Sequence, residues 1–439
     1  MRPHVWIIGG TTAGLMTAIR LLPYGFRLHI LERATPAKIA DQLDLSPPIW
    51  PGFFHATWSF LQEFPLPSLL PSIHSGSVTF FSPEGIPHSF PRTPLAPRLH
   101  LIPELLFFSG LAWRDRFHLL NFLEKNWEIG TSHEVTPDIQ TVEAWVTAAG
   151  QSETARNTVW GPLCRWLLGC DLSEASLRLF LAILTRYRQA TTRGRQWFFG
   201  TSSSPGELTA MMRKWLTKQG VQFHICENYP LFQYNGAKQE TLSLSGRAFS
   251  SSSVYVAALS PSDILSLLPE RALTKFSQFD QMAHIPSRSG TLLTFQCPNI
   301  QLPPAIILGS QFIDWLAILP SETSDTTLMS LLQDHQDLPP LETHIQIART
   351  RALLHKIFPL SSDSLLSLDH QSIMPQRLRL FPATAGSRAF RPQTNSPISN
   401  LFLVGPWIAS SLPPSMETLI NSINACAEAI ANRFFAGLR

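Results

Sequence analysis

The chain has 439 residues, of which 44% are hydrophobic and 15% are charged, so it can bury a sizeable core and lacks the composition of a disordered protein. It is too long for one simple core, and we expect two interleaved domains. The 34 basic and 31 acidic residues give a net charge of +3, and the Lys and Arg residues are scattered along the chain. This distribution argues against nucleic acid as a partner.

The cysteines and the apolar segments bear on compartment and membrane contact. Five scattered cysteines without a CxxC pair indicate neither a disulfide framework nor a zinc site, and a reducing, cytoplasmic compartment fits best. The apolar stretch Val5–Leu22 is interrupted by glycines and threonines and is too broken to span a bilayer. The content of proline and aromatic residues is high, with 36 prolines, 12 tryptophans and 28 phenylalanines. A hydrophobic ligand, a membrane surface or an ordinary core would each explain it.

The N-terminal elements follow a βαβ pattern, with a strand at His4–Ile8, a glycine turn, a helix over Ala13–Leu22 and a strand at Arg27–Leu31. Frequent Pro and Gly then predict loops and hairpins, with a helix near 57–64 and a strand-like run at 77–82. Helical periodicity returns in segments that we interpret as a helical subdomain and its exit: 99–109, 114–126, 141–149, 153–168, 174–186 and 207–219.

Sheet-forming patterns resume in the second half of the chain. Strands are predicted at 221–226 and 253–258, followed by a helix at 261–268 and a mixed region that runs to about residue 368. The last unit is a strand at 401–404, a turn, and a helix over 415–435. Strands therefore alternate with helices at both ends of the chain, which is typical of an α/β fold with a parallel sheet.

The first chemical motif lies between the first strand and the first helix and consists of Gly9, Gly10, Thr11, Thr12, Ala13 and Gly14. In a dinucleotide-binding turn, Gly9 permits the tight turn, Gly14 lets helix and strand pack closely, and the helix N-terminus faces a pyrophosphate. Glu32, at the end of the next strand, can accept hydrogen bonds from ribose hydroxyls. The middle glycine of GxGxxG is replaced by Thr11, and a βαβ turn without a ligand is the alternative interpretation.

The second motif is the C-terminal segment Asn400–Ala431, in which a buried apolar strand meets a glycine turn and a long helix. Gly405 marks the turn, and Pro413, Pro414 and Ser415 mark the helix start. Such a helix aims backbone N–H groups at an anion, although an amphipathic helix also forms for packing alone.

Together these ends resemble the flavin amine oxidase and phytoene desaturase superfamily. Within it, the chain is most similar to the squalene-associated FAD-dependent desaturases, the hydroxysqualene dehydroxylases of hopanoid and C30 isoprenoid synthesis. The internal stretches that resemble this group are Pro91–Leu123, Thr141–Ser176, Ser204–Ile225 and Val254–Pro269. The similarity is diffuse and runs nearly from end to end.

The resemblance implies FAD as the cofactor. Gly9–Gly14 would hold the pyrophosphate, Glu32 the ribose, and backbone near Tyr229 the adenine. At the other end, Gly405, Trp407 and the helix that begins near Ser415 and Met416 would lie against the ribityl chain and the flavin ring. Trp407 has an equally weighted alternative role in the core.

Three departures from the family pattern accompany these matches. Pro406 stands where the family has an acidic residue, so it supplies neither a carboxylate nor a backbone N–H. The expected Gly-Gly-Arg segment is absent from Ala34–Leu45, which leaves Arg33 as the nearby guanidinium, and Thr11 replaces a glycine. If each lost contact costs about 1 kcal/mol, FAD affinity falls by a few orders of magnitude. Retention of FAD is therefore a hypothesis, and a flavin-free relative that binds an isoprenoid or scaffolds neighbouring enzymes is the alternative.

The resemblance implies an FAD-dependent oxidoreductase that reduces hydroxysqualene to squalene or desaturates a polyprenoid. Its partner would be a hydrophobic isoprenoid, with peripheral membrane contact as a further expectation. A carotenoid desaturase or an amine oxidase with another substrate is a second alternative. A tunnel would be lined by Trp160, Trp166, Phe180 and Trp197, which an ordinary core explains equally. No catalytic acid or base can be named, because no acidic residue can be placed beside the histidines, among them His55, His74, His88, His100 and His118.

These observations predict an α/β fold in which a Rossmann-type FAD/NAD(P)-binding domain is interleaved with a substrate domain that carries a helical subdomain. The FAD-binding parts are expected at 1–75, 206–275 and 386–439, and the substrate domain at 76–205, with its helical part, and at 276–385.

Overall fold

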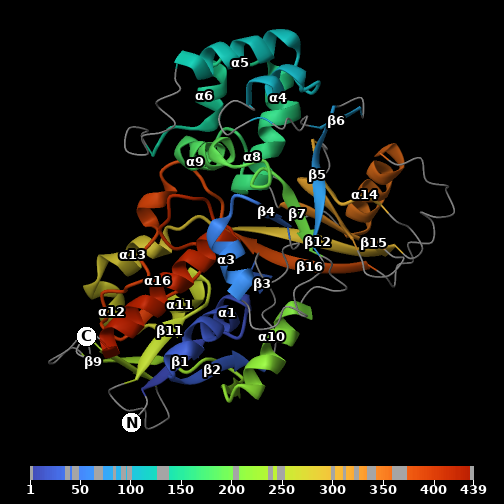
Figure 1. Cartoon of the computed structure of the whole chain (residues 1–439). Coiled ribbons are helices and arrows are strands. Elements are labelled where there is room, and N and C mark those ends of the chain that lie inside the picture. The colour runs from blue at the N-terminus through green and yellow to red at the C-terminus, as the bar shows by residue number, and fades with distance from the viewer. Residues whose placement is uncertain are drawn as a thin grey trace.

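The structure is a computed structural model (Figure 1). It describes residues 3–34, 40–41, 49–63, 73–82, 86–89, 95, 101–125, 138–200, 207–235, 241–244, 253–297, 302–309, 313–320, 326–333, 343–357 and 373–435. In Figure 1 a smaller sheet lies at the bottom of the view, a larger sheet in the middle and a group of helices at the top.

The smaller sheet is parallel and has the strand order β17-β11-β1-β2-β8. Its strands are β1 (His4–Ile8), β2 (Arg27–Arg33), β8 (Gln222–Cys226), β11 (Val254–Ala257) and β17 (Leu401–Leu403). Ile8, at the end of β1, pairs with Leu31 on one side and Ala257 on the other. The carboxyl ends of segments far apart in sequence therefore open at one edge, which is where ligands of such sheets bind.

Both faces of the parallel sheet are covered. On one face α1 (Thr12–Leu21) packs against α10 (Glu207–Lys218) and α16 (Met416–Phe435), and a short 3₁₀ turn, η1 (Leu22–Tyr24), follows α1. The other face carries a core that includes Trp6, Tyr255 and Phe279. The elements that follow β8 on this side are β9 (Phe232–Asn235), β10 (Thr241–Leu244), α11 (Pro261–Leu267), α12 (Glu270–Lys275) and α13 (Ser277–Ala283).

The larger sheet is mixed and follows the order β3-β16-β12-β15-β14-β13-β5-β7-β4, with β6 paired to β5. Its strands are β3 (Ala40–Asp41), β4 (Ile49–Pro51), β5 (Ile73–Phe81), β6 (Pro87–Ser89), β7 (Trp197–Gly200), β12 (Arg288–Cys297), β13 (Ala305–Leu308), β14 (Trp315–Pro320), β15 (Thr326–Gln333) and β16 (Ile373–Leu380). Two further elements in this half of the chain are α14 (Thr343–Ile357) and the 3₁₀ turn η5 (Ser387–Phe390).

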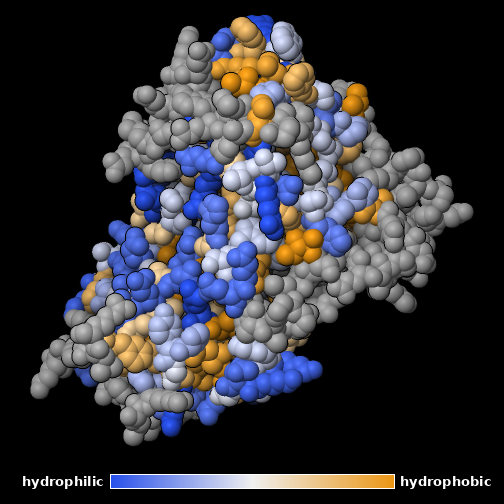
Figure 2. Space-filling view, in the orientation of Figure 1, coloured by the Kyte–Doolittle hydropathy of each residue, from blue (hydrophilic) through white to orange (hydrophobic). Residues whose placement is uncertain are grey.

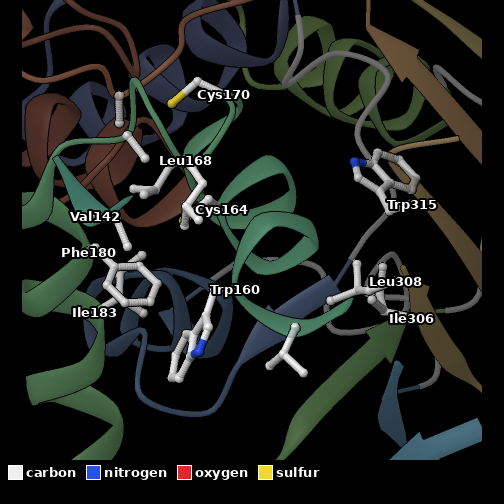
Figure 3. Packing of buried hydrophobic residues seen from close by; sticks show 14 of the residues in the cluster. Val142, Trp160, Cys164, Leu168, Cys170, Phe180, Ile183, Ile306, Leu308 and Trp315 are labelled. Atoms are coloured by element: carbon white, nitrogen blue, oxygen red, sulfur yellow. The ribbon is translucent and has the colours of Figure 1, made fainter. Parts of the chain in front are cut away.

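The helical part comprises α4 (Leu101–Phe107), α5 (Trp113–Lys125), α6 (Val142–Ala148), α7 (Glu153–Ala155), the π-helical turn η3 (Arg156–Trp160), α8 (Gly161–Leu168) and α9 (Leu177–Gln189). Its core reaches the larger sheet, because Trp160 and Phe180 belong to the same buried cluster as Ile306 of β13 (Figure 3). Trp145, Trp160 and Phe180 pack edge to face with ring centroids 6.3 Å apart. This packing favours the core role for Trp160 and Phe180 over the tunnel role.

The predicted α/β architecture is confirmed, whereas the proposed domain boundaries stay a prediction. The helix predicted at 153–168 is interrupted by the π-helical turn η3. Pro162 has no backbone N–H to donate, and the helix widens into the π-helical turn just before this proline. The helix predicted at 174–186 begins later, where the Ser176 side chain accepts a hydrogen bond from the Leu179 amide. Among the described residues, no helix combines the length and the apolar character needed to cross a bilayer.

A buried carboxylate connects the helix α16, which packs on the parallel sheet, with a helix that follows the strand β4 and with a helix of the helical part. Glu417 of α16 accepts hydrogen bonds from the amides of Ala56 and Thr57 at 3.1 and 2.9 Å, at the start of α3 (His55–Glu63). It also accepts from the Thr57 hydroxyl at 2.9 Å and from Nη1 of Arg186 on α9 at 2.8 Å. The carboxylate therefore compensates the N-terminus of α3 and one guanidinium at the same time.

We expect Glu417→Ala to lower the free energy of unfolding by about 3 kcal/mol, because it leaves buried donors of α3 and one guanidinium without an acceptor. Glu417→Gln keeps an acceptor oxygen and should cost less. Urea unfolding followed by circular dichroism measures both. Glu428→Ala, at an exposed position of the same helix, is the matched control and should change stability by less than about 0.5 kcal/mol. Equal losses for Glu417→Ala and Glu428→Ala would contradict the assignment.

Candidate functional site

The turn after β1 has the geometry of a close helix-to-strand contact. Gly9 has φ +115°, a left-handed conformation that favours glycine, and its amide donates to the Leu31 carbonyl at 2.9 Å. A Cβ on Gly9 would collide with the carbonyl oxygen of Ala258, and a Cβ on Gly14 would collide with the carbonyl oxygen of Gly9. Both glycines are therefore required by the packing of this turn.

The N-terminus of α1 is open to an anion. Thr11 is its N-cap residue, with φ −83° and ψ 177°, and its side chain makes no capping hydrogen bond. The first turn also contains no acidic residue, so the N–H groups at the start of the helix face the turn without a competing carboxylate of their own helix. Because Thr11 has extended backbone that any residue adopts, its replacement of a glycine causes no backbone strain. Thr12 is buried and Ala13 is half-buried beside it.

Glu32, the second-last residue of β2, has a buried carboxylate that lies against Gly10. Arg213 of α10 donates to both of its oxygens, Nη1 to Oε1 and Nη2 to Oε2. The pair fixes the carboxylate and places a half-buried guanidinium beside the glycine turn. Arg213 could not be singled out from the sequence, because a basic residue in an amphipathic helix is usually a solvated surface residue.

Arg33 and Tyr229 form a second contact at this edge of the sheet. The Arg33 guanidinium carbon lies 5.1 Å from the centroid of the Tyr229 ring, within the range of a cation–π interaction. Burial raises the pKa of Tyr229 well above its usual range. Tyr229, whose backbone the resemblance assigns to the adenine, is thus in contact with Arg33, the guanidinium nearest to the missing Gly-Gly-Arg segment.

The C-terminal turn reaches the same edge. Trp407 is buried, its indole N–H donates to the Leu259 carbonyl at 3.2 Å, and its ring fills the space that a side chain at Gly405 would need. The Gly405 amide donates to the Ser422 hydroxyl at 3.3 Å. This position supports the core role of Trp407, and its contact with a cofactor stays a prediction.

Side-chain hydroxyl groups at the start of α16 make the hydrogen bonds of its first turn. The Ser415 hydroxyl accepts from the Thr418 amide at 3.3 Å, and the Thr418 hydroxyl donates to the Pro413 carbonyl at 2.7 Å. Ser415 and Met416 are half-buried. The sequence placed this helix start correctly, and its proximity to a flavin ring stays a prediction.

The geometry fits an adenine dinucleotide at its adenosine and pyrophosphate end. The glycine turn, the uncapped N-terminus of α1 and the carboxylate of Glu32 lie together at the carboxyl edge of the parallel sheet. Arg213 holds the Glu32 carboxylate at this edge through a bidentate ion pair. Most of the segment where that motif was expected, 35–39 and 42–45, lies outside the described residues.

A family model described as "Flavin containing amine oxidoreductase" matches residues 53–431, which is most of the chain. The chain belongs to this family. It is an oxidoreductase family whose members contain flavin, and the dinucleotide geometry of the N-terminal turn agrees with that.

Several relatives and solved structures are similar to this oxidoreductase. The 15-cis-phytoene desaturase of Synechococcus elongatus is 23% identical over 322 residues, covering 69% of this chain and 67% of the relative. A probable zeta-carotene desaturase of the same organism is 23% identical over 488 residues, covering 97% and 98%. Cyclohexylamine oxidase from Brevibacterium oxydans IH-35A has a TM-score of 0.66 at 17% identity, covering 99% and 100%. An oxidoreductase from Methanosarcina mazei also has a TM-score of 0.66, at 14% identity, covering 97% and 100%. These structural likenesses show the shared fold.

The oxidoreductase also has a polar hollow between its helical part and the larger sheet. It encloses about 420 Å³ and is lined by Thr141, Ser173, Glu174, Pro286, Ser287, Arg288, Pro382, Thr384 and Ala385. Arg288 Nη2 donates to Oε1 and Oε2 of Glu174 at 2.6 and 2.5 Å. Since this ion pair occupies the charged groups of the lining, the hollow presents no unpaired acid or base. Among the described residues, no group of three or more metal-ligating side chains is gathered.

A row of three histidines crosses the parallel sheet and was not anticipated from the sequence. His4 Nδ1 lies 2.9 Å from His29 Nε2, and His29 Nδ1 lies 3.2 Å from His224 Nε2. Trp6 stacks on His29 with centroids 4.1 Å apart. Burial, followed by the charges of His4, His224 and Arg27, lowers the pKa of His29 to about 4, against a smaller opposing effect of a hydrogen bond with Gln222. In the sequence these residues are single histidines in three separate strands. Their contact depends on the pairing register of those strands, which the sequence alone does not show.

We expect this row to make stability depend on pH. Between pH 6.5 and about 4, His29 binds a proton in the unfolded chain but not in the folded one. Stability should therefore fall as the pH drops through this window and level off below it. Chemical unfolding at a series of pH values should show a shallower fall in His29→Gln. His284→Gln, at an exposed histidine, should keep the slope of the unmodified protein, and an unchanged slope in His29→Gln would refute the assignment.

Proposed function

We propose that this protein is an FAD-dependent oxidoreductase that acts on a polyprenoid lipid, with the reductive dehydroxylation of hydroxysqualene to squalene as its reaction. The observation that supports the cofactor most directly is the turn at Gly9–Gly14, with an uncapped helix N-terminus and Glu32 at the same edge of the sheet. This is the arrangement that binds the pyrophosphate and ribose of a dinucleotide.

In this proposal each group of the site has one task. The N–H groups of α1 bind the pyrophosphate, Glu32 accepts hydrogen bonds from the ribose, and Arg213 holds the carboxylate in place. Tyr229 and Arg33 border the adenine, and the segment from Gly405 to Met416 borders the flavin. Reduced FAD supplies the hydride in this reaction.

The substrate class is supported by the relatives and by the sequence stretches that resemble hydroxysqualene dehydroxylases. Both Synechococcus elongatus relatives are carotenoid desaturases by name, so their substrates are long polyprenoids. In the proposed reaction the allylic carbon of hydroxysqualene loses its hydroxyl group, which leaves as water after taking up a proton. The same carbon gains the hydride, and an external electron donor must reduce the flavin again.

The test is a single turnover under anaerobic conditions with chemically reduced, FAD-loaded protein. Hydroxysqualene should be converted to squalene, detected by gas chromatography and mass spectrometry, with reoxidation of the flavin absorbance. Conversion of phytoene or of an amine, with hydroxysqualene unchanged, would replace the proposed substrate by that of a carotenoid desaturase or an amine oxidase. A protein that takes up no FAD would favour the flavin-free alternative.

A matched pair of variants tests the role of Arg213 in the same preparation. Arg213→Met removes the guanidinium beside Glu32 and should weaken FAD binding about tenfold, since a charge-assisted contact is worth about 1.5–3 kcal/mol before compensation by water. Lys214→Met changes the exposed neighbour on the same helix and should leave FAD affinity unchanged. Equal affinities of the two variants would remove Arg213 from the proposed site.

A further inference from the structure

The hairpin of α4 and α5 presents large apolar side chains to solvent. Phe107, Trp113 and Phe117 have exposed fractions of 71%, 65% and 53%, and Ile102 of α4 is exposed as well. In Figure 2 hydrophobic residues gather at the top of the view, where Figure 1 places these two helices. We call Ile102, Phe107, Trp113 and Phe117 the aromatic tip. Exposed aromatic side chains gathered in this way are uncommon on a surface that faces only water.

The aromatic tip is anchored in the core of the helical part. Leu105 of α4, Phe108 in the turn that follows it and Leu119 of α5 are buried in the core of the helical part. Arg116 of α5 donates from Nε to the Leu111 carbonyl at 2.7 Å and from Nη1 to the Leu106 carbonyl at 2.6 Å, which closes the turn between the helices. The exposed aromatic side chains therefore project from a fixed platform and lose little backbone freedom on binding.

Both carboxylates of residues 101–121 point inward. Glu104 is buried and accepts from Arg195 Nη1 at 2.7 Å and from the Tyr187 hydroxyl at 3.0 Å. Asp115 is buried and accepts from the amide and the hydroxyl of Ser152 at 2.7 and 2.9 Å. The outer surface of this stretch therefore carries no carboxylate to repel an anionic surface.

The outward charge of this stretch is positive. Among residues 101–121, Arg114 is the exposed charged side chain and stands next to Trp113. Arg116 is committed to the backbone carbonyls of the turn, and His118 lies 3.2 Å from the Gly150 carbonyl. Aromatic and aliphatic side chains with a cation and without a carboxylate are the composition that partitions into the headgroup region of a bilayer.

We infer that the aromatic tip docks this protein onto a phospholipid bilayer that contains anionic lipid, with Phe107, Trp113 and Phe117 inserted at the interface and Arg114 at the headgroups. The inference goes beyond the proposed reaction, because it needs neither FAD nor a particular substrate. It commits to a lipid surface and not to a protein partner, since the tip combines interfacial aromatics with a cation.

The experiment is co-sedimentation of the purified full-length protein with phosphatidylcholine vesicles, with and without phosphatidylglycerol. The unmodified protein should bind both and bind the anionic vesicles more tightly. The triple variant Phe107→Ser, Trp113→Ser, Phe117→Ser should lose about 100-fold in partitioning, because three apolar side chains no longer leave water. Arg114→Glu should lose about tenfold on anionic vesicles and little on neutral ones.

The matched control is Ile225→Ser with Leu231→Ser, which removes two exposed apolar side chains on or just after β8. It should bind vesicles within about twofold of the unmodified protein. Phe107→Ser alone provides a mildly altered variant in case the triple variant does not fold, and it should lose about fivefold. The inference is overturned if the unmodified protein does not sediment with either vesicle, if the tip variants bind as tightly as it does, or if the control loses as much. Self-association through the tip in place of vesicle binding, seen by size-exclusion chromatography, would overturn it equally.

Discussion

The carboxylate of Glu417 is the constraint on which the arrangement of the two halves depends. A buried charge is tolerated only where hydrogen bonds and an opposite charge compensate it. Here the donors come from α3, which follows the strand β4 of the larger sheet, and from α9 of the helical part, while Glu417 itself begins the helix that packs on the parallel sheet. One side chain thereby fixes the position of the helical part relative to the C-terminal turn.

At the other end of the proposed cofactor site, close backbone packing is the dominant constraint. Gly14 lies against the carbonyl of Gly9, so the helix can approach the strand closely enough for its N–H groups to face the sheet edge. The replacement of a glycine by Thr11 is compatible with this, because the backbone there is extended. Arg213 adds a guanidinium beside Glu32 from a helix that lies far away in sequence. The Thr11 departure from the family pattern is therefore milder than the sequence alone indicates, while Pro406 still offers neither a carboxylate nor an N–H.

Much of the fold could be predicted from short-range sequence patterns. The apolar run at His4–Ile8, the glycine turn and Glu32 could be recognised because each is a pattern of a few consecutive residues. Contacts between segments far apart in the sequence could not be predicted. Arg213 with Glu32, Arg186 with Glu417 and His29 with His224 depend on packing and strand register, which single residues do not encode. The order of the larger sheet was missed for the same reason, because its strands come from segments with short and irregular patterns.

Packing also separates the aromatic residues into two groups that look alike in the sequence. Trp160, Phe180 and Trp407 are buried, whereas Phe107, Trp113 and Phe117 face solvent. Periodicity on a helix indicates that one face differs from the other, but burial of that face depends on what packs against it. The high aromatic content of the chain thus has two physical origins, a dense core and an exposed tip on the helical part.

We propose that the glycine turn and the start of α16 together hold FAD. The proposal is tested by a visible absorbance spectrum of the purified protein, followed by denaturation and chromatography of the released cofactor. The protein should show flavin bands and release FAD, either as purified or after incubation with added FAD. A colourless protein that takes up no FAD would contradict it. Release of FMN in place of FAD would contradict it as well, because Glu32 and the N-terminal turn would then have no adenosine end to bind.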